Sequence, residues 1–466
     1  MKKMSQPWLR LSAFLVAFTL CAGLPGLPKA HASQVDVLIE KLVEKRILTR
    51  IDAETIRAEV ETAEKKDFKA QVKSSTPWLE GLTAKGDVRL RYEGFERENE
   101  DSSDRNRYRF RVRWGLEKKL NDEWKAGFRL ATGTGTNEAT STNVTFDGEF
   151  GLKQIFIDQA YGIYTPTARV KEWMPAVDKV EIGAGKVANP YNDKWATTII
   201  WDGDVTPEGI YQAIDFKIAD VGEEGSWKWH NLLGQFVVDE DSNLSPGDVE
   251  MLAFGTGTTY SWKKGHDVSF KFTYYDWQDY IQFQKTNPSS LASSFGGNDR
   301  EVDDFKVLNF YADANFEVPT WWGRQNLKLF GDYAHNAGLQ EGGSTDEELR
   351  NPDLRGDSDD AFSLGATLGA AKEQGEWTLT YEYLYIEPNA VVGNFAESDL
   401  GVGYANNQGH RLSWKYMILK NLEFNATAWL VERIDKTILT YGSADLRPNG
   451  DDDQLLRTQV DFVYKF

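Results

Sequence analysis

The stretch RYRFRVRWGL, residues 107–116, alternates arginines with aromatic and aliphatic residues along most of its length. Successive side chains of a β-strand point to opposite faces, so this strand would have one cationic face and one apolar face. A soluble β-sandwich would bury the apolar face and leave the arginines in water. A barrel in a lipid bilayer would turn the apolar face outward to the lipid and the arginines inward to a wet lumen. This one strand fits both arrangements.

The same two-residue period recurs along most of the chain. Val88, Leu90 and Tyr92, for example, alternate with charged residues. The alternating segments lie near residues 88–93, 107–116, 124–130, 155–164, 180–187, 209–219, 227–238, 249–262, 266–277, 304–317, 326–335, 360–371, 376–387, 409–418, 421–432 and 455–466. Bacterial barrels have even strand numbers, and we therefore predict an all-β, antiparallel transmembrane barrel of about 16 strands over residues 83–466.

The connections between these segments alternate in length. Short polar turns occur at residues 118–123, 263–265, 319–325, 372–375 and 419–421, and long polar stretches at residues 133–150, 278–300, 336–359, 388–408 and 433–454. A barrel whose two ends face different compartments has this asymmetry. The long stretches are acidic, as in DSDD at residues 357–360, and we expect them to be solvated loops. The alternative is that divalent cations bridge them to anionic lipid headgroups.

The N-terminus has the features of a secretory signal peptide. Basic residues flank an apolar run at residues 11–24, and the motif Ala-His-Ala at residues 30–32 suits cleavage. We therefore expect residues 1–32 to be removed after Sec-type export. The only cysteine, Cys21, lies in this leader, so the mature chain would have no disulfide and no cysteine nucleophile. No apolar run of about 18 residues follows the leader, which predicts no transmembrane helix.

The charge balance limits the possible partners. The formal net charge is −19, and removal of the four leader cations would make it −23. Nucleic-acid binding requires a basic surface, so we predict no nucleic-acid partner.

Residues 33–82 differ in pattern from the rest of the chain. Val35, Leu38, Ile39 and Leu42 recur at helical spacing among charged residues. We predict a periplasmic amphipathic helical segment that ends in a linker. A coiled coil that joins subunits is the alternative, but fewer than three clean heptads are present.

The C-terminal strand ends in alternating aromatic residues, Phe462, Tyr464 and Phe466. A terminal aromatic residue on an alternating strand resembles the signal that the barrel-assembly machinery recognises in outer-membrane proteins. We therefore expect this machinery to be a partner.

Two local motifs carry a family resemblance. Residues 185–191 are GKVANPY, and residues 201–209 are WDGDVTPEG. This pair resembles the putative porin family of Gram-negative bacteria, in which a strand with the first motif runs into a loop with the second. Asn192 departs from the family pattern, which has a second aromatic residue there. The resemblance implies an outer-membrane channel for passive diffusion of small hydrophilic solutes, and a possible homotrimer.

Six arginines on the first two strands are predicted to face the lumen. They are Arg89, Arg91, Arg107, Arg109, Arg111 and Arg113. Cross-strand neighbours lie only about 5 Å apart, so these side chains would form a basic wall. A dry, unpaired wall of this kind would be costly, and water or carboxylates must therefore face it.

A charged loop follows the first motif and is predicted to narrow the lumen. Its charged residues are Asp193, Lys194, Asp202, Asp204 and Glu208. The hypothesis is a transverse field, with arginines on one wall and loop carboxylates opposite. Alternatively, these acids only cap turns. Overall acidity favours cations and the arginine wall favours anions, and local charge at the constriction decides between them.

Three other functions are alternatives to a channel. A barrel hydrolase would need a nucleophile beside a histidine, but His230, His266, His335 and His410 have no serine-centred motif next to them. A soluble periplasmic β-protein would not need the terminal aromatic signal, and an active transporter would need a larger N-terminal plug. No metal or cofactor motif is present, so no cofactor is predicted. The expected surroundings are outer-membrane lipid and lipopolysaccharide.

Overall fold

The computed structural model describes residues 41, 43–45, 53, 80–97, 104–135, 139–240, 248–281, 298, 304–321, 323–338, 358–400, 405–434 and 454–466. The chain divides into two compact units, Met1–Glu80 and Gly81–Phe466. The predicted signal peptide lies outside the described residues, as does most of the predicted helical segment at 33–82. Among the described residues, no helix is long and apolar enough to cross a membrane.

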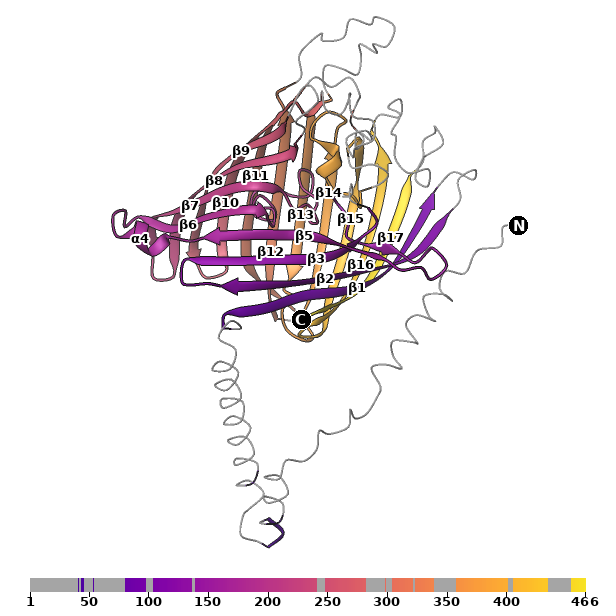
Figure 1. Cartoon of the computed structure of the whole chain (residues 1–466), viewed down its shortest axis with the longest axis horizontal. Helices are drawn as coiled ribbons and strands as arrows, with labels where there is room; N and C mark the ends of the chain where they lie inside the picture. Colours follow the sequence, from indigo (N-terminus) through magenta and orange to yellow (C-terminus); the bar gives the residue numbers. More distant parts are fainter. Residues whose placement is uncertain are drawn as a thin grey trace, which may run out of the picture. The chain divides into compact units, whose positions relative to one another are not determined.

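The second unit is an antiparallel sheet of 17 strands, and one of them, β4, has only two residues. The strands are β1 (Leu82–Arg97), β2 (Arg105–Lys119), β3 (Trp124–Gly133), β4 (Val144–Thr145), β5 (Gln154–Tyr164), β6 (Val177–Lys186), β7 (Glu208–Val221), β8 (Gly225–Asp239), β9 (Val249–Lys263), β10 (His266–Gln278), β11 (Phe305–Thr320), β12 (Gly323–Asn336), β13 (Asp360–Gly369), β14 (Trp377–Ile386), β15 (Asn407–Leu419), β16 (Leu422–Arg433) and β17 (Leu455–Lys465). The short helix α4 (Thr167–Lys171) lies between β5 and β6 (Figure 1). A 3-10 turn, η3 (Gly393–Phe395), lies between β14 and β15.

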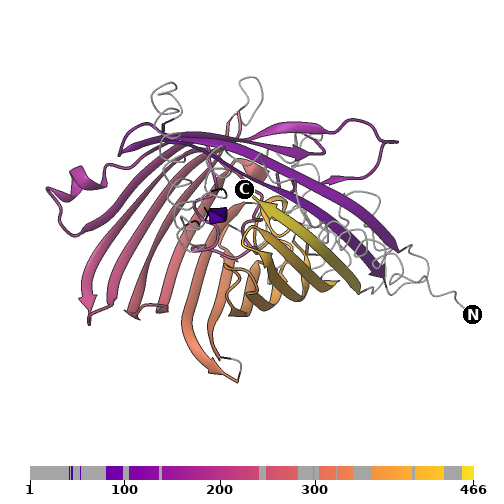
Figure 2. The same ribbon diagram turned by 90° about the horizontal axis from the view of Figure 1, so that it is seen from below.

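The sheet closes on itself. Strand β1 pairs with β2 on one side and with β17 on the other, although β17 lies at the opposite end of the sequence (Figure 2). The remaining long strands pair in chain order, and β4 adds a short bridge to β2 beyond the end of β3. The 16 long strands therefore form a closed barrel, which confirms the predicted strand number.

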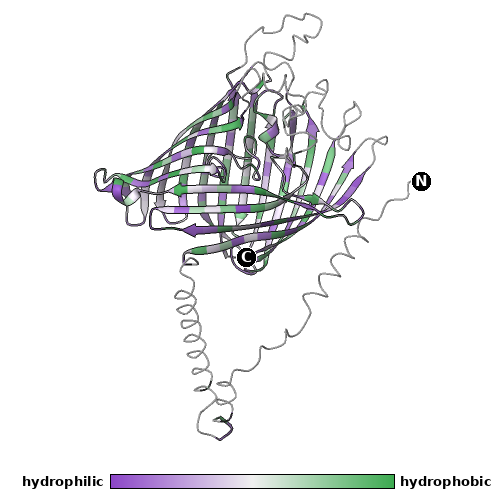
Figure 3. Ribbon diagram, in the orientation of Figure 1, coloured by the Kyte–Doolittle hydropathy of each residue, from purple (hydrophilic) through white to green (hydrophobic). Residues whose placement is uncertain are grey.

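The barrel is apolar outside and polar inside. Phe270, Phe310 and Leu364 are exposed on the outer face, whereas Asn309 and Ser363, their direct neighbours on β11 and β13, are fully buried inside. The colours of Figure 3 show the alternation of hydrophilic and hydrophobic residues along the strands. A soluble sandwich has the reverse arrangement. The structure therefore resolves the choice that the sequence pattern left open, in favour of a membrane barrel.

The barrel interior has its own apolar core, supplied by two connections that fold inward. We call residues 187–207 the first inner loop and residues 387–400 the second inner loop. Tyr191, Trp201 and Leu400 from these loops are almost completely buried in one hydrophobic cluster with inward-facing wall residues such as Tyr275 and Ile386. The two loops thus fill part of the lumen, and their charged residues are held against the opposite wall.

Candidate functional site

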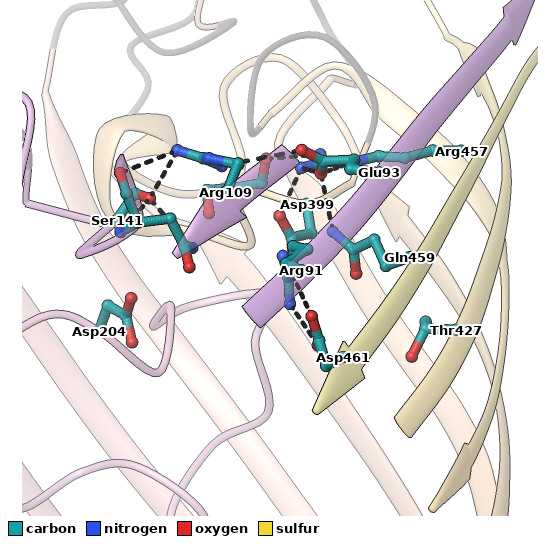
Figure 4. A network of polar contacts seen from close by, with 12 residues as sticks. Arg91, Glu93, Arg109, Ser141, Asp204, Asp399, Thr427, Arg457, Gln459 and Asp461 are labelled. Atoms are coloured by element: carbon teal, nitrogen blue, oxygen red, sulfur yellow. Dashed lines mark hydrogen bonds and ion pairs between the residues drawn. The ribbon is translucent and has the colours of Figure 1, made fainter. Parts of the chain in front are cut away.

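The candidate site is a cluster of arginines on three neighbouring strands, β17, β1 and β2. The strand registers place Arg91 opposite Arg109 and Arg89 opposite Arg111. A seventh arginine, Arg457, comes from β17. We call these seven residues the arginine cluster: Arg89, Arg91, Arg107, Arg109, Arg111, Arg113 and Arg457. Figure 4 shows part of it, with Arg91 and Arg457 converging on carboxylates from different elements.

Arg91 is 6% exposed and is held by two carboxylates. Its Nε and Nη2 donate to the two carboxylate oxygens of Asp461 at 2.7 and 2.9 Å, in a bidentate pair. Its Nη1 donates to Asp399 of the second inner loop at 3.2 Å. The loop is therefore tied to the strand wall by a charged contact.

Glu93 on β1 is the most deeply buried acid of the site. Its carboxylate accepts hydrogen bonds from Arg457, with Nε at 2.8 Å, and from Arg107. Arg457 also contacts Asp399 at 2.6 Å. The second inner loop is thus held to β1 and β17 through one carboxylate, Asp399, that bridges two guanidiniums.

Asp204 is the corresponding contact of the first inner loop. Its carboxylate accepts from Arg113 and lies 3.8 Å from Arg111. The backbone N–H and the hydroxyl of Thr142 donate to its other oxygen, each at 3.1 Å. The structure therefore brings the predicted arginine wall and one predicted loop acid into direct contact.

The arginines determine the charge state of the loop carboxylates. Burial alone would raise the pKa of Asp204, but Arg113 and Arg111 more than offset it and hold the pKa below its usual range. Arg457 and Arg91 do the same for Asp399. Both carboxylates therefore remain ionised at neutral pH.

Two members of the cluster have mainly neutral partners. Arg89 donates to the side-chain oxygen of Asn143, with its Nε at 3.1 Å. Arg109 donates to the hydroxyl of Ser141 at 3.3 Å and to the carbonyl of Asn143 at 3.2 Å, and Glu93 comes no closer to it than 3.9 Å. The buried Nε of Arg109 has no hydrogen-bond partner. These two guanidiniums are thus the least compensated of the cluster.

The charges of the site do not cancel. Among the described residues, five carboxylates form ion pairs with six of the seven arginines: Asp87, Glu93, Asp204, Asp399 and Asp461. Within the part of the chain that the structure describes, the arginine cluster therefore has two more arginines than carboxylate partners, although the whole chain is strongly acidic.

The two inner loops are also bound to each other. The backbone N–H of Ser398 donates to Asp202 at 3.0 Å, and the N–H of Asp202 donates to the carbonyl of Phe395 at 2.7 Å. The N–H of Glu397 donates to the carbonyl of Thr198 at 2.9 Å. Asp202 thus joins one loop to the other and does not pair with the arginines.

The other predicted loop residues lie apart from the arginine cluster. Asp193 has a left-handed backbone with φ of 63°, next to Lys194, on the side of the loop near Tyr311 and Lys271. Glu208 is the first residue of β7 and pairs with Lys186 at 2.8 Å. Of the five predicted residues, only Asp204 contacts the arginines directly.

The structure adds residues that the sequence pattern did not single out. Arg457 and Asp461 share the inward parity of β17, so their lumenal position could have been inferred from the alternation with Phe462. Asp399 and Asn143 lie in long connections, where no periodicity indicates a position. Their contacts depend on how the connections fold, and no local sequence signal identifies them.

A cavity of about 720 Å³ adjoins the site. Its lining includes the polar residues Thr142, Asp158 and Asp204 and the aromatic residues Trp201, Trp277 and Phe395. A solute could therefore occupy a space that borders both the aromatic core and the first inner loop.

Comparisons with known proteins give one family match and several solved structures of low sequence identity. A family model described as a putative porin matches residues 95–304 and 301–441. The high-pH structure of Pseudomonas putida OprB has 11% identity and a TM-score of 0.48, and the alignment covers 84% of this chain and 96% of that one. A mutant of Rh. blastica porin has 10% identity and a TM-score of 0.39, and the alignment covers 83% of this chain and 100% of that one. No curated protein sequence matches the chain. The barrel assignment rests on the closed sheet itself.

Proposed function

Since the chain belongs to the putative porin family, we propose that its outer-membrane diffusion channel prefers small hydrophilic anions, carboxylates above all. The family and the closed barrel establish a channel for passive diffusion in the outer membrane. The preference for anions rests on the two lumenal arginines that have mainly neutral partners.

The observation behind the proposal is the pair Arg89 and Arg109. Both lie within the arginine cluster and are bound mainly by neutral oxygens. A guanidinium offers two parallel N–H donors to a carboxylate, so an anion entering the lumen would gain a charge-assisted contact. Local charge at a constriction outweighs net charge far from it, and the chain's formal charge of −19 is therefore compatible with anion preference.

Reversal potentials in planar bilayers test this proposal. Wild-type protein in a KCl gradient is expected to show a reversal potential of the sign that indicates chloride preference. The double variant Arg89→Gln/Arg109→Gln should move the potential toward cation preference. Arg324→Gln is the matched control, because Arg324 is 66% exposed and pairs with Glu317 outside the cluster. A cation-selective wild type, or a double variant with unchanged potential, would contradict the proposal.

A hydrolase is the second candidate function, and one constellation favours it. His230 contacts Asp215 at 2.8 Å through Nδ1 and Thr259 at 3.1 Å through Nε2. This is the order of a carboxylate, a base and a hydroxyl. However, the strands that carry these residues use their backbone N–H groups in the sheet ladders, which leaves no obvious oxyanion donors there. We therefore prefer the channel, and a fluorophosphonate probe that labelled Thr259 would reverse that choice.

Several aspects of biogenesis are proposed on sequence patterns alone. We propose that residues 1–32 direct Sec-type export, that residues 33–82 lie in the periplasm, and that the barrel-assembly machinery recognises Phe462, Tyr464 and Phe466. A homotrimer in contact with lipopolysaccharide is proposed on the same basis. Mass spectrometry of the mature N-terminus and native electrophoresis of detergent extracts would test the first and last of these proposals.

A further inference from the structure

A second group of chemically reactive side chains lies at the barrel rim, away from the arginine cluster. His335 is near the end of β12, Asp360 begins β13, and Asp359 precedes it. One donor atom from each of these three residues lies within 4.8 Å of the others, and among the described residues this is the one such group. The group lies where β12 ends and β13 begins, and all three residues are partly exposed.

The separations between the donor atoms match those around a bound metal ion. Nδ1 of His335 lies 3.0 Å from a carboxylate oxygen of Asp360 and 3.6 Å from one of Asp359. Zinc binds nitrogen and oxygen ligands at about 2.0–2.1 Å, so two ligands at the tetrahedral angle are about 3.3 Å apart. The two observed separations, 3.0 and 3.6 Å, lie on either side of this ligand–ligand distance.

The ligand positions are fixed by the barrel wall. His335 and Asp360 are direct partners in the register of β12 and β13. The hydroxyl of Tyr333 donates to Asp360 at 2.7 Å, and the backbone N–H of Asp360 donates to Glu387 at 2.8 Å. Hydrogen bonds of this kind orient metal ligands and support affinity. The site is therefore preorganised on rigid elements.

From this geometry we propose that His335, Asp359 and Asp360 bind a divalent transition-metal ion, with Zn²⁺ as the best match. An imidazole combined with carboxylates suits zinc and its neighbours in the first transition row, whereas calcium and magnesium prefer oxygen ligands alone. His335 and Asp360 have side chains that are 37% and 45% exposed, so the ion can enter from water and retain a water ligand. A bound ion would tie the end of the connection before β13 to the rim of β12.

Isothermal titration of Zn²⁺ into detergent-folded protein, purified without a histidine tag, tests the proposal. Wild-type protein should bind one ion. His335→Gln keeps a hydrogen-bond donor near Asp360 but removes the imidazole, and it should weaken binding by at least about 100-fold. His266→Gln is the matched control, because His266 begins β10 at the opposite rim and should leave binding unchanged.

A spectroscopic measurement identifies the ligands independently of affinity. Cu²⁺ bound to the wild type should give an electron paramagnetic resonance signal coupled to one imidazole nitrogen, and His335→Gln should lose this coupling. Asp359→Asn/Asp360→Asn should weaken binding while the nitrogen coupling persists at high copper. Heat-modifiable mobility in gel electrophoresis verifies that each variant is folded. Zinc binding that His335→Gln leaves unchanged, or no binding by folded wild type at millimolar zinc, would overturn the proposal.

Discussion

At the scale of single residues, Asp204 and Asp399 make the arginine cluster possible. Burying a guanidinium without a partner is costly, and removal of one partner from a buried pair leaves an uncompensated charge. Each of these loop acids serves two arginines: Asp204 lies near Arg113 and Arg111, and Asp399 bridges Arg91 and Arg457. Selectivity and loop position are therefore coupled through the same contacts.

Asp204→Asn should make the channel more anion-selective. The substitution keeps the shape of the side chain but removes a negative charge beside Arg113 and Arg111. The surplus of positive charge in the arginine cluster would rise by one, so the reversal potential should move further toward chloride. Glu208→Asn is a suitable control, because Glu208 pairs with Lys186 and contacts no member of the arginine cluster. Equal shifts in both variants would show that the effect is not specific to the cluster.

Glu397 should make the packing of the second inner loop depend on pH. Burial, reinforced by the charge of Asp399, raises the pKa of Glu397 to about 7. An acid whose pKa is higher in the folded state than in the unfolded state stabilises the folded state when the pH is below its unfolded pKa. This contribution is lost as the pH rises through the folded-state pKa. Arg411 and Glu382 also face Glu397 and act in opposite directions on it. The loop should therefore be packed more firmly at pH 5 than at pH 9.

Thiol labelling of Ala396→Cys measures this dependence. Ala396 is fully buried, and the only native cysteine, Cys21, lies in the predicted leader. The labelling rate of Ala396→Cys is divided by the rate of the same cysteine in a Glu397→Gln background. This division cancels the intrinsic effect of pH on the reactivity of the thiol. This ratio should rise between pH 5 and pH 9. A constant ratio would mean that Glu397 does not control the packing of the loop.

At the scale of elements, the two inner loops form a small hydrophobic core inside the barrel. The rings of Trp277 and Phe395 are stacked with centroids 5.2 Å apart, and Trp201 packs on both. The indole N–H of Trp201 also donates to the hydroxyl of Tyr275 at 3.2 Å. Aromatic packing and one buried hydrogen bond thus hold the first inner loop against the wall formed by β10.

Trp201→Ala should release the first inner loop and enlarge the open channel. Truncation of a buried tryptophan costs about 3–5 kcal/mol, and it removes the aromatic contacts to Trp277 and Phe395 and the hydrogen bond to Tyr275. Single-channel conductance should therefore rise or become noisy, whereas the folded barrel should persist. Trp227→Ala is the control, because Trp227 is 41% exposed on the outer face. Similar conductance in wild type and Trp201→Ala would show that the loop does not limit the flow of ions.

The strands could be predicted from the sequence, but the interior contacts of the loops could not. The period of two indicated every long strand, because lipid outside and water inside impose it residue by residue. It also placed the six predicted arginines on one face. Asp399 and Asn143 reach the arginine cluster through contacts between distant segments, and such contacts leave no local period. For that reason the second inner loop appeared only in the structure.

At the scale of the whole molecule, the barrel depends on the seam between β1 and β17. The seam pairs residues from Asp87–Lys465 to Arg97–Leu455. The backbone of Phe466 exchanges two hydrogen bonds with Gly86, at 3.0 and 3.1 Å. A side chain at position 86 would place its Cβ 2.6 Å from the ring of Phe466 and 2.3 Å from the carbonyl of Arg113. Gly86 is therefore required for the close approach of three chain segments at the seam.

Substitutions at Phe466 and at Gly86 should impair biogenesis at different stages. Gly86→Leu blocks the seam sterically, so it should prevent barrel closure both in cells and during refolding in detergent. Phe466→Ala removes only the ring and keeps the backbone bonds to Gly86, so purified protein should refold. If the terminal aromatic residue is recognised by the assembly machinery, the same variant should nevertheless accumulate poorly in the outer membrane. Heat-modifiable mobility after refolding, compared with the amount in membrane fractions, distinguishes the two roles. Equal recovery of Phe466→Ala in both measurements would limit Phe466 to a packing role, and loss in both would show that its ring is needed to close the barrel.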